Sequence, residues 1–400
     1  MALIQIEETR KGKSPGGFAL FALGFRPFFL ASGLFAVIYL GTWLAALQGA
    51  MPTPAGIAPT AWHGHEMLFG YAAGVIGGFL LTAAQNWTSI PMPRGSALAM
   101  LFVLWLAGRV LPWLPVPYLA IAIVDLLFLP VLLVAVLRPV LRVQQTRNYP
   151  FPFMLLGLTA ANALFHAGAL GFDPAYTMLG LDLALYLIVL MMVVMGGRVI
   201  PYFTERRLNS TAKKWVPIEW LASATTLAVL AAVLAAPALF SGMLLAFLAA
   251  AAAIVHAIRL AGWHDKRLWR VPLLWVLHLG YGWIVIGFLL DALYAAGMVP
   301  PFLALHAYAA GGIGVLTLGM MARVSLGHTG RILEAPAIMT WAFVLVNLSA
   351  VLRVFGPLLL PAQTTMLPHA SGALWMAAFA LFAVVYAPML WRPRVDGKPG

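Results

Sequence analysis

The sequence has no cysteine and few charged side chains. Of its 400 residues, 9% are Asp, Glu, Lys or Arg, whereas 63% are apolar. The absence of cysteine excludes disulfides, iron–sulfur clusters, thiolate-ligated haem and thiolate sites for zinc or copper, so any metal must be held by His, Met, Tyr or carboxylate side chains. Because soluble globular domains carry about 25% charged residues, the shortage of charge predicts a polytopic membrane protein.

Apolar runs long enough to cross a hydrocarbon layer of about 30 Å occur twelve times. We therefore predict an all-α fold with twelve transmembrane helices in a single transmembrane domain, residues 1–400. The first run is too long for a cleavable signal peptide and should remain as a helix. The predicted helices are 18–47, 62–86, 97–114, 116–137, 151–170, 176–200, 216–235, 238–260, 271–296, 301–324, 336–356 and 367–391.

The basic residues indicate how these helices are oriented. Nearly all of the 24 Lys and Arg residues fall at the two ends of the chain or at its even-numbered connections. By the positive-inside rule, both termini are then cytoplasmic. The net charge of +12 is mostly a signal of topology and gives no reason to expect nucleic acid as a partner. Arg109 and Arg353 are the exceptions, because they lie toward the outer ends of the third and eleventh predicted helices.

Related segments end the second, sixth and tenth predicted helices. They read LTAAQNWTS, GGRVIPYFTER and MARVSLGHTGR. When the threonines in these segments are aligned, His65 and His306 occupy the same position, 23 residues earlier. The pattern predicts three repeats of four helices, at 18–147, 148–270 and 271–400. The alignment also places both histidines in the outer portion of the membrane.

Histidines within the predicted helices are the main candidates for a metal site. A neutral imidazole is a good ligand for haem iron, copper or zinc, and ionisable groups inside a membrane are candidates for function. The alternative is an interhelical hydrogen bond, which contributes about 1 kcal/mol. For His65 and His306 we favour a bis-histidine site, because they lie at one depth on different helices. His166 and His278 are the next candidates.

The segment AWHGHEMLFG, residues 61–70, suggests a second metal site. Residues two apart on a helix point about 200° apart, so His63 and His65 cannot readily bind one metal. His63 and Glu66 are three apart and share a helix face, which makes them a candidate pair of ligands. The alternative, which we favour, is that His63 precedes the helix and the helix dipole stabilises Glu66 in the first turn.

Three motifs resemble the signatures of the NnrS family. They are LGFRPFFL at 23–30, WHGHEMLFG at 62–70 followed by GFLLTAAQNWT at 78–88, and MARVSLGHTGR at 321–331. The resemblance extends over essentially the whole chain. It implies a bacterial inner-membrane protein that is associated with haem and copper, is produced in response to nitric oxide and protects against nitrosative stress. The motifs alone do not fix the metal ligands.

The predicted architecture is also similar to the large subunit of the haem–copper oxidases and the related nitric oxide reductases. In those proteins, histidines on the second and tenth helices hold a haem, and arginines at the outer face pair with its propionates. The similarity implies that His65 and His306 are axial ligands of a haem b and that Arg109 and Arg353 pair with its propionates. Anchoring at the membrane interface is the alternative for both arginines. Tyr308 stands where the oxidases have the histidine of a second haem, so a second haem of that kind is not expected.

From these features we expect a haem-dependent protein in the lipid bilayer that binds or turns over nitric oxide. The electron donor is unknown, and the presence of copper or another second metal stays open. Catalysis by an oxidoreductase and sensing by a haem protein both fit the sequence. A transporter or efflux protein without haem is the alternative class, because twelve helices with internal repeats also suit that function.

Overall fold

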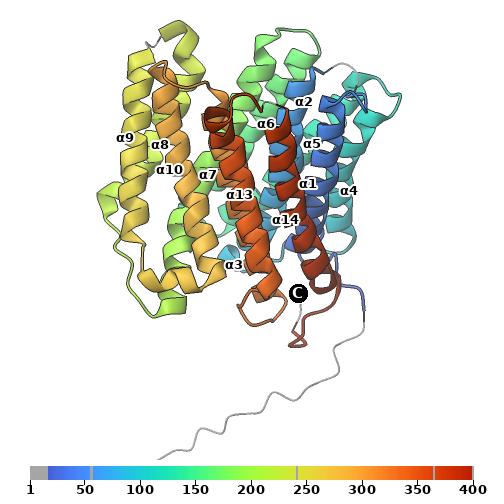
Figure 1. The fold of residues 1–400 in the computed structure, drawn as a ribbon. Helices are drawn as coiled ribbons and strands as arrows, with labels where there is room; N and C mark the ends of the chain where they lie inside the picture. Colours follow the sequence, from blue (N-terminus) through green and yellow to red (C-terminus); the bar gives the residue numbers. More distant parts are fainter. Residues whose placement is uncertain (1–16, 55–56, 240–241, 364, 399–400) are drawn as a thin grey trace, which may run out of the picture.

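The computed structural model describes residues 17–54, 57–239, 242–363 and 365–398, and these residues form helices and connections without any strand. Twelve helical spans are long and apolar enough to cross a membrane, so the predicted all-α membrane fold is confirmed (Figure 1). The elements are α1 Phe25–Leu47, α2 Pro59–His65, η1 Glu66–Ala72, α3 Ala73–Thr88, α4 Ser96–Val110, η2 Leu111–Trp113, α5 Tyr118–Arg142, η3 Thr146–Asn148, α6 Pro150–Ala169, α7 Ala175–Leu208, α8 Val216–Leu239, α9 Gly242–Gly262, η4 Lys266–Arg270, α10 Pro272–Ala295, α11 Phe302–His306, η5 Ala307–Ile313, α12 Gly314–His328, α13 Ala337–Leu359 and α14 Met366–Trp391.

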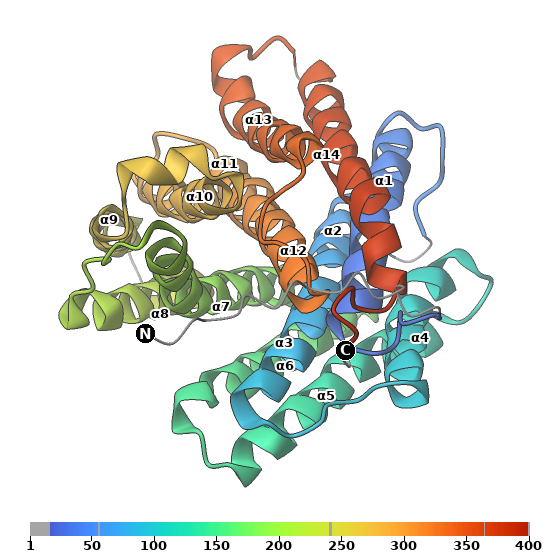
Figure 2. The same ribbon diagram turned by 90° about the horizontal axis from the view of Figure 1, so that it is seen from below.

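The helices form three arms around a central group (Figure 2). One arm contains α4, α5 and α6, the second contains α8, α9 and α10, and the third contains α13 and α14 with α1 beside them. The spans that contain α2 and α12 lie toward the centre. Their burial agrees with this position: 78% of the most apolar window in Pro59–Thr88 is buried, against 28% in Ser96–Trp113. The three arms are compatible with the three predicted repeats, whose boundaries stay a prediction.

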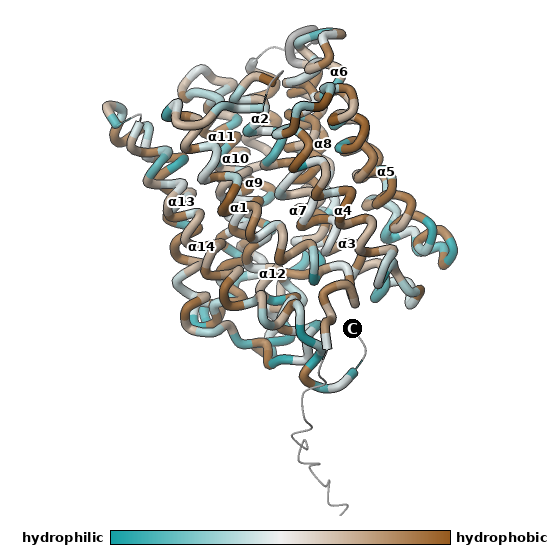
Figure 3. Tube along the Cα trace, turned by 90° about the vertical axis from the view of Figure 1, so that its right-hand side faces the viewer, coloured by the Kyte–Doolittle hydropathy of each residue, from teal (hydrophilic) through white to brown (hydrophobic). Residues whose placement is uncertain are grey.

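The outer surface of the bundle is suited to lipid. Hydrophobic residues cover the sides of the helices, and hydrophilic residues gather at the connections between them (Figure 3). Large apolar side chains such as Val103, Ile123, Trp341 and Val384 are exposed on the outer helices. Exposed apolar surface on this scale is unfavourable in water, and a bilayer removes that cost.

The two ends of the described chain meet at one end of the bundle. The Ala19 N–H group donates a hydrogen bond of 2.7 Å to the Trp391 carbonyl. The buried Arg26 side chain donates from Nη1 to the carbonyls of Leu390 and Arg392, at 2.8 and 2.7 Å. An even number of spans requires both ends of the chain to lie on the same side. That this side is the cytoplasm stays a prediction.

Two central spans change helix type at corresponding places. α2 ends at His65 and α11 ends at His306, and each helix continues directly into a π-helix, η1 and η5 respectively. π-Helices are rare and occur frequently at functional sites. The shared position of η1 and η5 agrees with the alignment that made the two histidines equivalent.

The start of α2 corrects one interpretation of the sequence. We favoured a helix that begins after His63, but α2 begins at Pro59 and therefore includes this histidine. Proline suits the first turn of a helix because its φ angle is already helical and its missing N–H group would have no partner there. Glu66 begins η1 and does not lie in the first turn of the span.

A close approach between α6 and α7 generates a first prediction. A Cβ atom on Gly180 would lie 2.5 Å from the Ala161 carbonyl oxygen and 2.7 Å from the Phe165 nitrogen. Because both neighbours are backbone atoms, they cannot rotate away. Gly180→Ala should lower the free energy of unfolding by about 1–3 kcal/mol, measured by thermal unfolding in detergent. Gly282→Ala is the control, because its Cβ atom would lie 3.8 Å from Leu260. Equal destabilisation by both variants would contradict the prediction.

Candidate functional site

A cluster of buried polar and charged side chains lies between the second, third, fourth and fifth spans. Such groups are costly in an apolar interior unless they are paired, so their partners are informative. We call this group the His65 cluster. Its members are His65 and Glu66 at the junction of α2 and η1, Arg109 on α4, Asp125 on α5, and Asn162 and His166 on α6.

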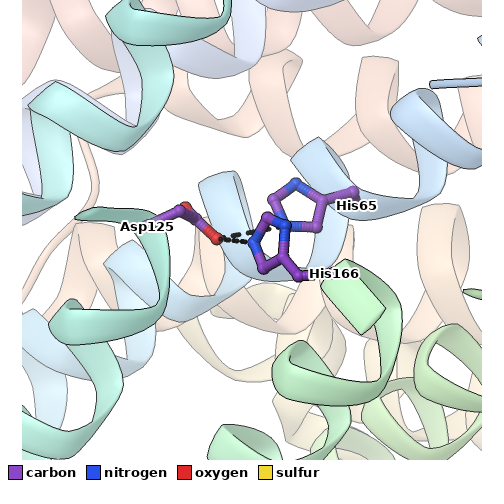
Figure 4. Close-up of side chains that lie close together, drawn as sticks. All are labelled: His65, Asp125 and His166. Carbon is purple, nitrogen blue, oxygen red and sulfur yellow. Dashed lines mark hydrogen bonds and ion pairs between the residues drawn. The ribbon is translucent and has the colours of Figure 1, made fainter. Parts of the chain in front are cut away.

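Asp125 is at the centre of the His65 cluster. Its Oδ2 atom lies 2.9 Å from His166 Nε2 and 3.2 Å from His65 Nε2. The same oxygen accepts a hydrogen bond of 2.8 Å from Asn162 Nδ2, while Oδ1 pairs with the Arg109 guanidinium. Figure 4 shows both imidazoles beside this carboxylate. One ligand atom from each of His65, Asp125 and His166 lies within 4.8 Å of the other two.

The ring nitrogens of His65 and His166 that do not contact Asp125 also have partners. His65 Nδ1 lies 3.0 Å from Glu66 Oε1, and His166 Nδ1 lies 2.9 Å from the Tyr118 hydroxyl oxygen. Arg109 Nη1 donates a hydrogen bond of 3.0 Å to Glu66 Oε2. The orientation of each imidazole is therefore fixed at both nitrogens. Arg109 connects the two carboxylates of the cluster.

A second pair of imidazoles is His63 on α2, which contacts α1, and His306 at the end of α11. The His63 ring stacks on Trp43 with a centroid distance of 4.6 Å, and its Nδ1 atom lies 3.3 Å from the Tyr39 hydroxyl oxygen. His306 Nδ1 lies 2.7 Å from the Phe302 carbonyl oxygen. No described residue forms a hydrogen bond with Nε2 of either histidine.

Arg353 on α13 adds a positive charge to this second place. Its charge acts on both His63 and His306, and the two imidazoles interact electrostatically with each other. In the described part of the chain, no residue forms a hydrogen bond or ion pair with the Arg353 side chain. We call these three residues the His306 site. An unpaired cation in a poorly solvated position favours binding of an anion.

The predicted site residues divide between these two places. His65, Glu66 and Arg109 belong to the His65 cluster, whereas His63, His306 and Arg353 belong to the His306 site. The structure does not place His65 against His306, or His63 against Glu66. Successive residues of a helix turn by about 100°, so His63 and His65 face different neighbours. Residues that the sequence alignment makes equivalent also need not face the same interface.

Asp125, Asn162 and Tyr118 were not predicted from the sequence, and His166 was only a later candidate. A signal was available for Asp125, which is the only acidic residue in the predicted helix 116–137. An ionisable residue within a membrane span is a candidate for function even without a motif.

The Arg109 ion pairs generate a second prediction. Arg109→Gln leaves the Glu66 and Asp125 carboxylates buried without their cation, so it should lower stability by about 3–5 kcal/mol. The measurement is the midpoint of thermal unfolding in detergent. Arg207→Gln is the control, because it breaks an exposed ion pair of 2.7 Å with Glu334. Exposed pairs contribute little to stability, so this control should unfold like the unchanged protein. A midpoint of unfolding for Arg109→Gln equal to that of the control would show that the buried ion pairs do not contribute to stability.

Comparison with known proteins identifies the family. The family model described as NnrS protein matches residues 19–394, which is nearly the whole chain. No curated protein matches. The motifs that suggested the resemblance lie at the start of α1, across α2, η1 and α3, and around the end of α12. The chain therefore belongs to the NnrS family.

Proposed function

We propose that this protein is a haem-dependent bacterial inner-membrane protein that binds or turns over nitric oxide and thereby protects against nitrosative stress. Membership of the NnrS family supports the relation to nitric oxide. The observation that carries the proposal is the His306 site. There, two imidazoles whose Nε2 atoms have no described hydrogen-bond partner lie within electrostatic range of Arg353, a cation that has no counterion among the described residues.

The His306 site fits the ligand chemistry of a haem b. Axial histidines bind iron through one ring nitrogen while the other nitrogen is held by a hydrogen-bonding partner. The Phe302 carbonyl can only accept, so His306 Nδ1 carries the hydrogen and Nε2 keeps its lone pair. Tyr39 lies at His63 Nδ1 and Trp43 stacks on the ring, and a Tyr39 hydroxyl that accepts from Nδ1 would leave Nε2 with its lone pair. A bound haem would supply an electron store, and nitric oxide could bind its iron only if one of the two histidines left.

We assign His63 as the partner of His306 in this site. His65 is the partner suggested by the repeat alignment, but both of its ring nitrogens are engaged in the His65 cluster. Binding of His65 to a haem iron would require these buried contacts to break. His63 Nε2 has no described hydrogen-bond partner, so binding of His63 to iron breaks no buried contact at that atom.

We assign Arg353 to the haem propionates. A guanidinium forms strong charge-assisted hydrogen bonds with a carboxylate, and the pairing is most favourable away from water. Arg109 was expected to act in the same way, but its guanidinium pairs with Glu66 and Asp125 in this structure. Arg353 is therefore the available cation of the two.

A central cavity supports the binding of a small apolar molecule. Its volume is about 90 Å³, and it lies between the central spans, α7 and α10, with Ile76, Met192, Leu277 and Thr317 in its lining. The cavity is too small for a haem but large enough for a diatomic gas. Nitric oxide partitions into apolar surroundings and suits this place.

The proposed axial ligands generate a third prediction, which optical spectra of the purified protein can test. His63→Ala and His306→Ala should each convert a low-spin haem spectrum to high spin or abolish haem binding, because each removes one imidazole ligand. His65→Ala should keep the low-spin spectrum. His369→Ala is the control, because this exposed ring bonds to Gln48 at 2.9 Å, outside both sites.

The same spectra distinguish the alternatives. Loss of the low-spin spectrum in His65→Ala but not in His63→Ala would favour the pair expected from the repeat alignment. An unchanged six-coordinate spectrum in both His63→Ala and His306→Ala would remove the His306 site as the haem site. Protein that contains no haem at all would favour the transporter class. Consumption of nitric oxide by the reduced protein would separate turnover from sensing.

The unpaired arginine generates a fourth prediction. Arg353→Leu removes a charged hydrogen-bond partner, which costs about 1.5–3 kcal/mol per bond, so haem should be lost about 10- to 100-fold more readily. Arg353→Lys retains the charge and should bind haem better than the Leu variant does. Haem is measured per mole of correctly inserted protein, with Arg331→Leu as the control. Full haem occupancy in Arg353→Leu would leave only interfacial anchoring for this residue.

A further inference from the structure

The His65 cluster contains an uncompensated negative charge when its imidazoles are neutral. Glu66 and Asp125 are carboxylates, whereas Arg109 is the only Lys or Arg residue among the six members of the cluster. All three side chains are buried. A buried charge without a counterion is strongly unfavourable, so the cluster favours one further cation.

The hydrogen-bonding pattern of His65 indicates where this cation lies. The Glu66 carboxylate, ion-paired with Arg109, can only accept, so His65 Nδ1 carries the ring hydrogen. The Nε2 atom of the neutral ring then has a lone pair. This lone pair faces Asp125 Oδ2 at 3.2 Å and Asn162 Oδ1 at 3.1 Å. Two oxygens and a lone pair repel one another unless a proton or a metal ion lies between them.

We propose that a divalent first-row transition-metal ion binds between His65 Nε2, His166 Nε2 and Asp125 Oδ2. Two of the separations between these donor atoms are 3.2 and 2.9 Å. In a tetrahedral site with metal–ligand bonds of about 2.1 Å, the donor atoms lie about 3.4 Å apart. The site therefore needs only a small adjustment to accept the ion. Imidazole nitrogens with a carboxylate oxygen suit zinc, copper and iron, whereas magnesium and calcium prefer oxygen ligands alone.

Each proposed ligand is oriented by a second residue. Glu66 holds Nδ1 of His65 at 3.0 Å and Tyr118 holds Nδ1 of His166 at 2.9 Å, so both rings present Nε2 to the same point. The second oxygen of Asp125 pairs with Arg109. Outer partners of this kind fix the tautomer and raise the basicity of histidine ligands in metal sites. A hydrogen bond that only joined two helices would not need them.

The number of protein ligands is compatible with chemistry at the metal. Three protein ligands from three helices are typical of catalytic sites, in which a fourth position holds water or substrate. The Asn162 side chain lies beside this position, 3.1 Å from His65 Nε2. The metal site shares no ligand with His63, His306 or Arg353. It therefore stands independently of the proposed haem site.

Titration of the whole purified protein with Zn²⁺ or Co²⁺ alone, after chelator treatment, tests the metal site. We expect one equivalent of metal to bind, a higher midpoint of thermal unfolding, and absorption bands of tetrahedral or five-coordinate Co²⁺. Asp125→Asn and His166→Ala should reduce bound metal at least about tenfold, because each removes one of only three protein ligands. His369→Ala is the control and should bind metal like the unchanged protein. The haem spectrum should be the same in all four proteins.

Tyr118→Phe provides a test that avoids a large change in packing. It removes only the hydroxyl group that orients His166, and metal affinity should fall about 10- to 100-fold. If the ligand variants cannot be isolated folded, this variant and the titration of the unchanged protein decide the matter. Folded, unchanged protein that binds less than about one tenth of an equivalent of either metal would overturn the proposal, because a proton on His65 Nε2 would then be the cation. Equal metal affinity of the Tyr118→Phe variant and the unchanged protein would also overturn it.

Discussion

The contact between Arg109 and Asp125 is the interaction on which the first half of the bundle depends. Charged side chains are tolerated in an apolar interior only when each has a partner, and this ion pair joins α4 to α5 inside the protein. The other oxygen of Asp125 reaches α6 through Asn162 and His166, and Arg109 reaches η1 through Glu66. Four spans are thereby held in one relative arrangement by groups that cannot separate without being left uncompensated.

The two sites differ at the residue that follows each of the two aligned histidines. η1 begins with Glu66, while η5 begins at the equivalent position with Ala307. Arg109 therefore has a carboxylate partner on η1, whereas Arg353 has no described partner on η5. The His65 cluster is therefore negatively charged and favours a metal ion. The His306 site is positively charged and favours an anion.

The sequence predicted the fold better than it predicted the sites, for a physical reason. The number of spans follows from apolar length, because the bilayer sets the same requirement for every helix. The pairing of His63 and His65 with their neighbours depends on helix rotation and on the π-helix at Glu66, which nearly uniform apolar sequences do not specify. Asp125 stands alone in its span and belongs to no motif, so its role became apparent only when α4, α5 and α6 were brought together.

The two sites are completed at different stages of protein synthesis. Every member of the His65 cluster lies before residue 167, so all its side chains have been made when less than half of the chain exists. The His306 site needs α2 from the beginning of the chain and α11 and α13 from near its end. The residues of the early cluster are therefore all synthesised before the last residues of the His306 site, which is complete only after α13 has been made. The order of translation thus sets the order in which the two sites mature.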